Sequence, residues 1–180
     1  MLTLLTSGAP MFEPSAVGEG WSPPAETVWI DLLTPTRDEE LAVEQALGVQ
    51  LPTAEEMAQI EPSSRLYQEG GATFMTASVL ARSDDGPSTE PVTFVLVHGV
   101  LVTIRYAELR AFTVFGAQAS TIGVASGSAA RLGLLDAIIE RPAGIVEQTG
   151  ANVETTPPAI IHPPEDTMVE HSPPPCTGPT

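Results

Sequence analysis

The side chains with the greatest capacity for chemistry in this 180-residue chain are carboxylates that occur side by side. Divalent cations such as Mg²⁺ take oxygen ligands and can be held by one or two carboxylates plus waters. Each group also has an ordinary structural explanation, since acids in a first helical turn favour the helix dipole and Asp-Asp-Gly is common in turns. The candidates are Asp38-Glu39-Glu40, Glu55-Glu56, Asp84-Asp85 and Glu165-Asp166.

The other residue types that carry out catalysis or bind nucleotides are poorly placed. A serine nucleophile needs a nearby base, and Ser126 in Gly123-Val124-Ala125-Ser126-Gly127 stands one position late for a nucleophile elbow. His98 is expected to be a turn or partly buried structural residue. The chain contains no Lys, which a phosphate-binding loop requires. We therefore predict that the protein is not an enzyme and binds no nucleotide.

The charge is strongly negative, with 23 acids against seven bases, all of them Arg, and a net charge of −16. This balance argues against binding to nucleic acid or to an anionic membrane surface, and it favours divalent cations or basic partners. The only cysteine is Cys176, so no intramolecular disulfide can form. These features favour a cytoplasmic protein.

No apolar stretch reaches the ~20 residues that a membrane-spanning helix needs. The longest one, Val92 to Ile104, is interrupted by polar residues and by Gly99. We therefore expect no direct membrane insertion of this chain.

The same local sequence pattern predicts the start of two helices. Thr36 followed by Glu39 is a capping box, in which each side chain bonds the other residue's free backbone N–H. It predicts a helix from about Arg37 to Leu47, closed by Gly48.

Thr53 and Glu56 repeat this pattern. They predict a short helix through about Ile60, with Met57 and Ile60 on its inner face.

Strand-like segments dominate the middle of the chain. Both faces of the run from Val92 to Val97 are largely apolar, which indicates a central strand covered on both sides and hence an α/β fold. Helices are expected at 107–117 and from 128 or 129 to about 139, with a kink or stop near Pro142. The expected strands are 27–32, 65–67, 72–81, 91–98 and 100–106.

Three segments follow from these patterns. Residues 1–26 are rich in Gly and Pro and are expected to be irregular, with at most a short strand near Leu2 to Thr6. Residues 27–150 form the folded domain. Residues 151–180 are Pro-rich with almost no aliphatic pattern, and we expect them to be disordered.

An ordered series of segments resembles the amino-terminal cytoplasmic domain of the CorA family of magnesium and cobalt transporters. The resemblance covers roughly residues 27 to 150 and implies an α/β/α sandwich with a mixed central sheet. In the family this domain leads through a long helix to two membrane helices and a Gly-Met-Asn pore loop, assembled as a pentamer. The matching segments are Trp29 to Thr36, Glu39-Glu40, Leu51-Pro52-Thr53, Glu61, Ser64 to Tyr67, Val92 to Leu96 and Leu101 to Tyr106.

The chain departs from the family after the domain. Its only Asn is Asn152, preceded by Ala151, so Gly-Met-Asn does not occur. The Pro-rich end does not resemble the family, which suggests a truncated or frameshifted reading frame or a shortened chain. The expected function is therefore that of a CorA-type soluble domain without a pore. The alternative is a stand-alone regulatory module that associates with intact transporter subunits.

The resemblance also implies a regulatory metal site. Family members hold divalent cations between neighbouring cytoplasmic domains with acids on the short helix after the Pro-Thr step and on the long stalk helix. Glu56, with Glu55 beside it, matches the first of these positions. Because the second carboxylate would come from the missing stalk, magnesium is expected to bind only as a weak regulatory ion. Capping and dipole roles for Glu55 and Glu56 are the stronger interpretation.

Overall fold

The protein is built around one mixed β-sheet. The computed structural model describes residues 1–7, 13–61, 65–83 and 86–139. Within these residues, seven strands follow the order β2-β1-β3-β7-β6-β5-β4. The strands are β1 (Leu2–Thr6), β2 (Glu13–Ser15), β3 (Thr27–Leu33), β4 (Leu66–Glu69), β5 (Ala72–Ser83), β6 (Gly86–Val97) and β7 (Val100–Arg105).

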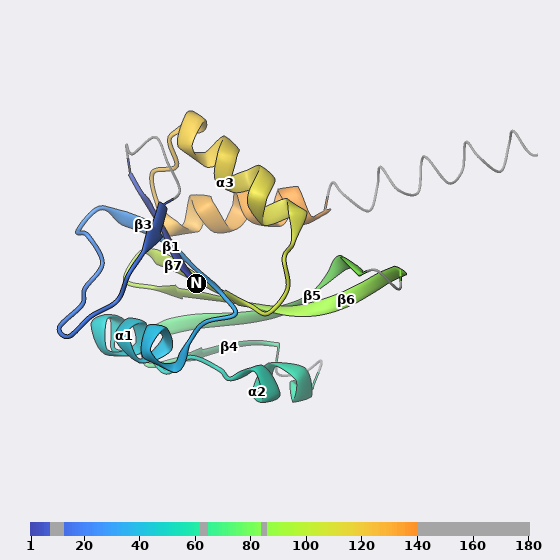
Figure 1. Ribbon diagram of the computed structural model, residues 1–180, viewed down its shortest axis with the longest axis horizontal. Coiled ribbons are helices and arrows are strands. Elements are labelled where there is room, and N and C mark those ends of the chain that lie inside the picture. The colour runs from blue at the N-terminus through green and yellow to red at the C-terminus, as the bar shows by residue number, and fades with distance from the viewer. Residues whose placement is uncertain (8–12, 62–64, 84–85, 140–180) are drawn as a thin grey trace, which may run out of the picture.

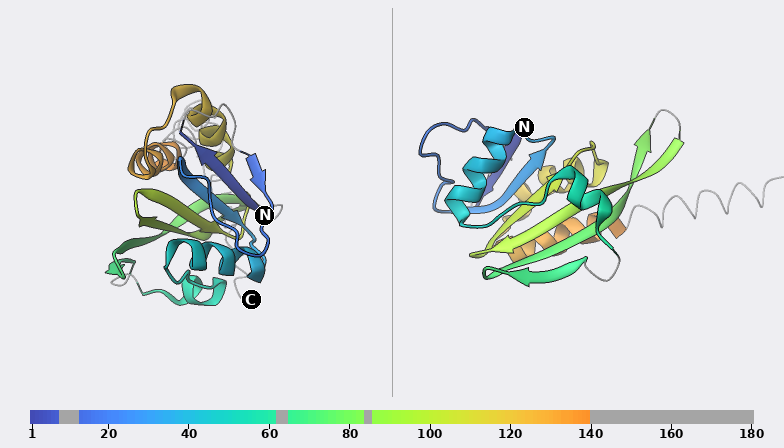
Figure 2. Two further views of the ribbon diagram at one scale, coloured as in Figure 1. Left: turned by 90° about the vertical axis from the view of Figure 1, so that its left-hand side faces the viewer. Right: turned by 90° about the horizontal axis from the view of Figure 1, so that it is seen from below.

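Helices cover both faces of this sheet (Figures 1 and 2). One face carries α1 (Arg37–Leu47) and α2 (Ala54–Gln59), and the other carries α3 (Arg110–Ile122) together with a helix over 127–139. All neighbouring strands are antiparallel except β3 and β7, which run parallel. The predicted α/β/α sandwich with a mixed sheet is therefore confirmed.

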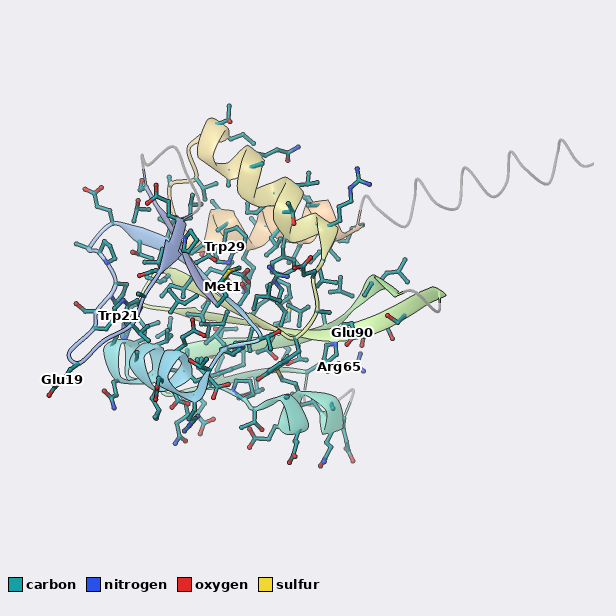
Figure 3. The ribbon with its side chains drawn as sticks, in the orientation of Figure 1. Met1, Glu19, Trp21, Trp29, Arg65 and Glu90 are labelled. Carbon is teal, nitrogen blue, oxygen red and sulfur yellow. The ribbon has the colours of Figure 1, made fainter. Side chains whose placement is uncertain are left out.

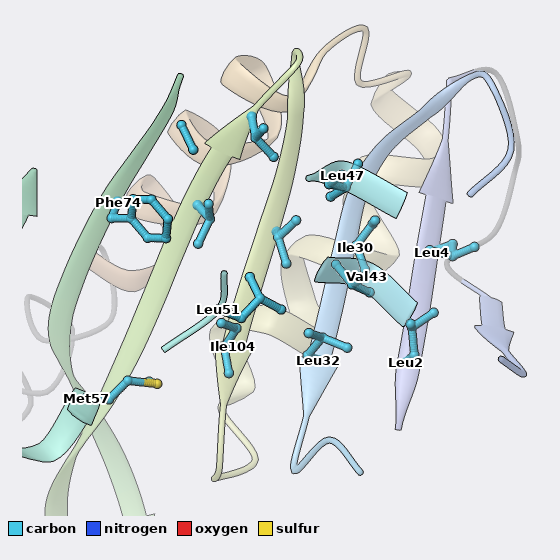
Figure 4. Close-up of a cluster of buried hydrophobic side chains, with 14 residues drawn as sticks. Leu2, Leu4, Ile30, Leu32, Val43, Leu47, Leu51, Met57, Phe74 and Ile104 are labelled. Atoms are coloured by element: carbon cyan, nitrogen blue, oxygen red, sulfur yellow. The ribbon is translucent and has the colours of Figure 1, made fainter. Parts of the chain in front are cut away.

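Two apolar cores fill the spaces between the layers. The core under α1 and α2 is shown in Figure 4, where Val43 and Leu47 of α1 face Ile30 and Leu32 of β3. The core on the opposite face packs Trp29 and Leu101 of the sheet against Phe112 of α3. β6 supplies Val95 to the first core and Phe94 to the second, which confirms that it is a central strand buried on both sides.

Both capping boxes are present. Thr36 and Glu39 bond each other's backbone N–H groups at the start of α1, and Gly48 ends the helix in the left-handed conformation at φ 66°. Thr53 and Glu56 do the same at the start of α2. Met57 is buried as expected, whereas Ile60 lies just beyond the helix and is half-buried.

The beginning of the chain is more ordered than its composition indicates. The short strand expected near Leu2 to Thr6 exists, and Leu2 and Leu5 are both almost fully buried. It lies inside the sheet between β2 and β3. The edge strand β2, with Pro14 at its centre, was not predicted.

The helix expected at 107–117 starts later, since α3 begins at Arg110 and runs to Ile122. The guanidinium of Arg105 donates a hydrogen bond to the carbonyl of Ala107 at 2.9 Å, so this carbonyl is engaged outside the helix. The next helix begins at residue 127, one position before the expected start. The expectations for Pro142 and for a disordered segment at 151–180 lie outside the described residues.

The start of the helix over 127–139 lies unusually close to the sheet. The backbone N–H of Gly127 donates to the carbonyl of Gly99 at 2.9 Å. A Cβ atom at position 127 would lie 2.4 Å from the nitrogen of Leu101 and 2.5 Å from the oxygen of Gly99. Glycine is therefore required at this contact between two backbones.

No helix within the described residues has both the length and the hydropathy needed to cross a bilayer.

Candidate functional site

Glu55 and Glu56 lie in the first turn of α2, and both side chains are exposed. One carboxylate oxygen of Glu56 accepts hydrogen bonds from the backbone N–H of Thr53 at 2.8 Å and from its hydroxyl at 3.0 Å. These two bonds lower the pKa of Glu56, although slight burial opposes them. The stabilisation that this cap gives to the fold is therefore fully present above the usual pKa of glutamate. It is lost as the pH falls through the lowered pKa of Glu56 in the folded protein.

These two carboxylates do not form an enclosed metal site. Within the part of the chain that the structure describes, no group of three or more His, Cys, Asp or Glu side chains is arranged to hold an ion. Mg²⁺ that is bound through one or two carboxylates keeps several waters, and its affinity is correspondingly low without further ligands. The sequence-based assignment of Glu55 and Glu56 as a metal site stays a prediction.

The acids of α1 are engaged in other contacts. A carboxylate oxygen of Glu39 accepts from the backbone N–H of Thr36 at 2.8 Å and from the amino group of Met1 at 3.0 Å. Burial alone would raise the pKa of Glu39, but these bonds outweigh it and lower the pKa. Glu40 pairs with Arg37 at 3.0 Å. The pairs Asp84-Asp85 and Glu165-Asp166 lie outside the described residues.

An open cavity of about 650 Å³ lies between one side of α1, the loop that follows it, α2 and the edge strand β4. Glu56 contributes to its wall, together with Glu69 and Tyr67 of β4. Tyr67 stacks on Phe74 of β5 with parallel rings whose centroids are 4.7 Å apart. Burial raises the pKa of Tyr67, and the charges of Glu69 and Glu56 raise it further. Three carboxylates, those of Glu44, Glu56 and Glu69, therefore share this cavity with an aromatic ring and with Arg37, which pairs with Glu44 at 3.7 Å.

A second polar cluster is enclosed in the core between β3, β7 and α3. Asp31 and Arg105 form an ion pair at 2.7 Å, and Asp31 also accepts from the hydroxyl of Thr103 at 2.7 Å. The indole N–H of Trp29 donates to Thr103 at 2.9 Å. Figure 3 places Trp29 between the sheet and the helices of this face. The guanidinium of Arg105 also lies over the ring of Phe112, at 4.5 Å from its centroid.

This cluster is closed to small molecules. The side chains of Asp31 and Arg105 are 1% and 8% exposed, and their polar atoms are satisfied by one another and by Thr103 and Ala107. The role of this buried cluster is therefore to join β3 to β7.

His98 lies outside this cluster. It is exposed at φ 50° in the two-residue turn that links β6 to β7, as its sequence context predicts.

Sequence reasoning identified Glu56 but not its neighbours in the cavity. Tyr67 and Glu69 come from a short strand whose four residues are all exposed, so no burial pattern distinguishes them. Asp31 and Arg105 are 74 positions apart, so no local sequence pattern predicts that they pair.

Comparison with known proteins gives consistent results. No family model matches the chain. It is 31% identical to the magnesium transport protein CorA of Salmonella typhimurium over 132 residues, which are 72% of this chain and 42% of that protein. The corresponding protein of Escherichia coli K12 is 31% identical over 135 residues, 73% of this chain and 43% of the relative. The chain thus spans less than half the length of these relatives, which are named as transport proteins and not as enzymes.

Solved structures share the fold. The soluble domain of CorA from Methanocaldococcus jannaschii superimposes with a TM-score of 0.62 at 14% identity, covering 86% of this chain and 62% of that one. The cytoplasmic domain of ZntB from Vibrio parahaemolyticus superimposes with a TM-score of 0.55 at 15% identity, covering 83% of this chain and 64% of that one. At these identities the likeness concerns the fold alone.

Proposed function

Because this chain is a homologue of the CorA magnesium transport proteins, we propose that it serves as the cytoplasmic domain of a CorA-type magnesium or cobalt transport system. The observation that carries this proposal is the 31% identity over 72% of the chain. The shared α/β/α fold supports it. In this role the domain lies in the cytoplasm, forms homo-oligomers and contributes no ion pathway of its own.

A second role is that of a stand-alone regulatory module that associates with intact CorA-type subunits. The strongly acidic composition supports contact with divalent cations in either role. The two roles differ in whether the chain changes the transport activity of a separate, complete subunit.

The chain alone is expected to conduct no ions, because its 180 residues contain no apolar stretch of the ~20 residues that spanning a bilayer requires. Liposomes reconstituted with the purified chain and loaded with a magnesium-sensitive dye should take up Mg²⁺ or Co²⁺ no faster than protein-free liposomes. Liposomes containing the full-length Escherichia coli relative serve as the positive control. Uptake above the protein-free rate would contradict the proposal.

The same liposomes separate the two roles. Purified chain added to the face of the Escherichia coli transporter that carries its soluble domain should leave uptake unchanged if the chain acts only within its own transport system. A regulatory module should change the uptake rate and remain bound to the transporter when the liposomes are washed.

Divalent cations are expected to stabilise the fold by screening alone. The net charge of −16 is relieved by added salt, so the melting temperature should rise without saturating up to roughly tens of millimolar Mg²⁺, Co²⁺ or Ca²⁺. Differential scanning fluorimetry across a titration of each ion measures this response, and the three ions are compared with one another at equal ionic strength. Little preference among the three ions is expected, because Glu56 is already engaged by Thr53.

A matched variant distinguishes ligand loss from cap loss. Glu39→Gln weakens the box at the start of α1 as Glu56→Gln weakens the box at the start of α2, and it also removes the ion pair of Glu39 with the amino group of Met1. A saturable, Mg²⁺-selective shift that disappears in Glu55→Gln and Glu56→Gln but persists in Glu39→Gln would establish a metal site at α2 and overturn the screening account.

A further inference from the structure

The edge strand β4 leaves backbone groups free for a further strand. β4 pairs with β5 on one side, and within the described residues no strand pairs with its other side. The carbonyl of Arg65 accepts from the N–H of Thr76, so 65↔76, 67↔74 and 69↔72 are the hydrogen-bonded pairs of this antiparallel ladder. The N–H and C=O groups of Leu66 and Gln68 therefore point away from β5.

The two edges of the sheet differ in how well they are protected against pairing with a further strand. At the opposite edge, β2 has three residues with Pro14 in the middle, and proline offers no N–H to an added strand. β4 contains no proline, and its residue Leu66 is 66% exposed. β4 is therefore the edge at which an extended polypeptide can pair with the sheet.

The side chains beside this edge favour a positively charged ligand. Tyr67 and Glu69 lie on the same face of β4, because side chains alternate along a strand, and both line the cavity that also contains Glu56. Arg37 at the cavity wall is already paired with Glu40 and Glu44. One face of the Tyr67 ring stacks on Phe74, and 37% of the residue stays exposed, so the ring can receive a cation on its outer side.

We propose that the β4 edge and the adjoining cavity bind an extended, arginine- or lysine-bearing segment of a partner protein. The segment pairs with the outward N–H and C=O groups of Leu66 and Gln68, and its basic side chains lie between Glu56, Glu69 and the ring of Tyr67. The raised pKa of Tyr67, caused by burial and then by these two carboxylates, is consistent with a negative potential in the cavity.

Charge excludes the two occupants that the chain itself could supply. A second copy would bring a second Glu69 to the same edge, where the like charges would repel each other. Residues 140–180 contain six acids and only one base, Arg141. A basic segment of another protein remains as the complementary occupant.

The test uses the full chain and a seven-residue peptide that alternates Val and Arg. Isothermal titration calorimetry should give one site, and the backbone amide signals of Leu66 and Gln68 should shift on binding. Leu66→Pro removes one outward N–H, leaves the bonds to β5 in place and also changes a side chain at the cavity wall, so affinity should fall about fivefold or more. Glu69→Gln should weaken binding by about twofold to fivefold, as for a partly exposed charge pair.

The controls distinguish binding at this specific site from non-specific attraction of a basic peptide to the acidic protein. Asp38→Asn removes the same charge from an exposed position on α1 outside the cavity wall and should change affinity less than about twofold. A peptide with N-methylated amides and one with citrulline in place of Arg should both bind poorly. If Leu66→Pro fails to fold, the N-methylated peptide still tests the backbone pairing. Equal weakening by Asp38→Asn and Glu69→Gln, full affinity of the N-methylated peptide, or no binding at all would overturn the proposal.

Discussion

Replacing Asp31 with Ala is expected to lower the free energy of unfolding by about 3–5 kcal/mol, the cost of removing one partner of a buried ion pair. The change leaves the guanidinium of Arg105 charged and only 8% exposed, and it removes the acceptor of the Thr103 hydroxyl. Denaturation in urea, followed by the fluorescence of the fully buried Trp29, measures the loss.

Two further variants identify the cause of this loss. Changing both partners, Asp31→Leu with Arg105→Met, removes the unpaired charge of Arg105. This double variant should recover most of the free energy of unfolding that Asp31→Ala loses. Arg37→Ala breaks the exposed pair with Glu40 and should have a small effect, because exposed ion pairs contribute little. A double variant as unstable as Asp31→Ala alone would show that shape, and not the unpaired charge, dominates.

The second large effect is expected for Gly127→Ala. Its added Cβ would lie 2.4 Å from the nitrogen of Leu101 and 2.7 Å from the carbonyl carbon of Val100, and neither backbone atom can rotate away. The helix over 127–139 must therefore move off the sheet, which loosens the packing of Ala130 and Leu134. We expect a loss of about 3 kcal/mol, at the upper end of what overpacking costs.

Thermal unfolding by circular dichroism measures this effect against a matched glycine. Gly18→Ala places the same methyl group where no atom lies within 4 Å, so its melting temperature should remain nearly unchanged. Equal stability of the Gly127→Ala and Gly18→Ala variants would show that the helix shifts without cost and would contradict the close approach.

What the sequence could predict depends on how far apart the interacting residues lie. The two capping boxes were identified correctly because each involves residues three positions apart. The start of α3 was placed too early because its N-cap residue, Leu109, makes no side-chain capping bond.

The candidate site shows the same dependence on distance. Glu56 belongs to a local pattern, whereas the cavity that it shares with Tyr67 and Glu69 forms only when β4 folds back beside α2. The contact of Gly127 with Gly99 is equally non-local, so a glycine there looks like any other loop glycine in the sequence.

The bonds that join Trp29 and Asp31 to Thr103 and Arg105 all cross the one parallel ladder of the sheet, between β3 and β7. Sliding β3 by one residue would exchange the side chains that face the two cores, so Asp31 would turn away from Arg105. Sliding it by two residues would keep every apolar side chain on its proper face, so hydrophobicity alone does not prevent that error. A two-residue slip that sets Asp31 opposite Leu101 instead of Thr103 would move it away from Arg105 and leave both charges unpaired inside an apolar layer. The ion pair therefore opposes a slip that hydrophobicity alone would allow.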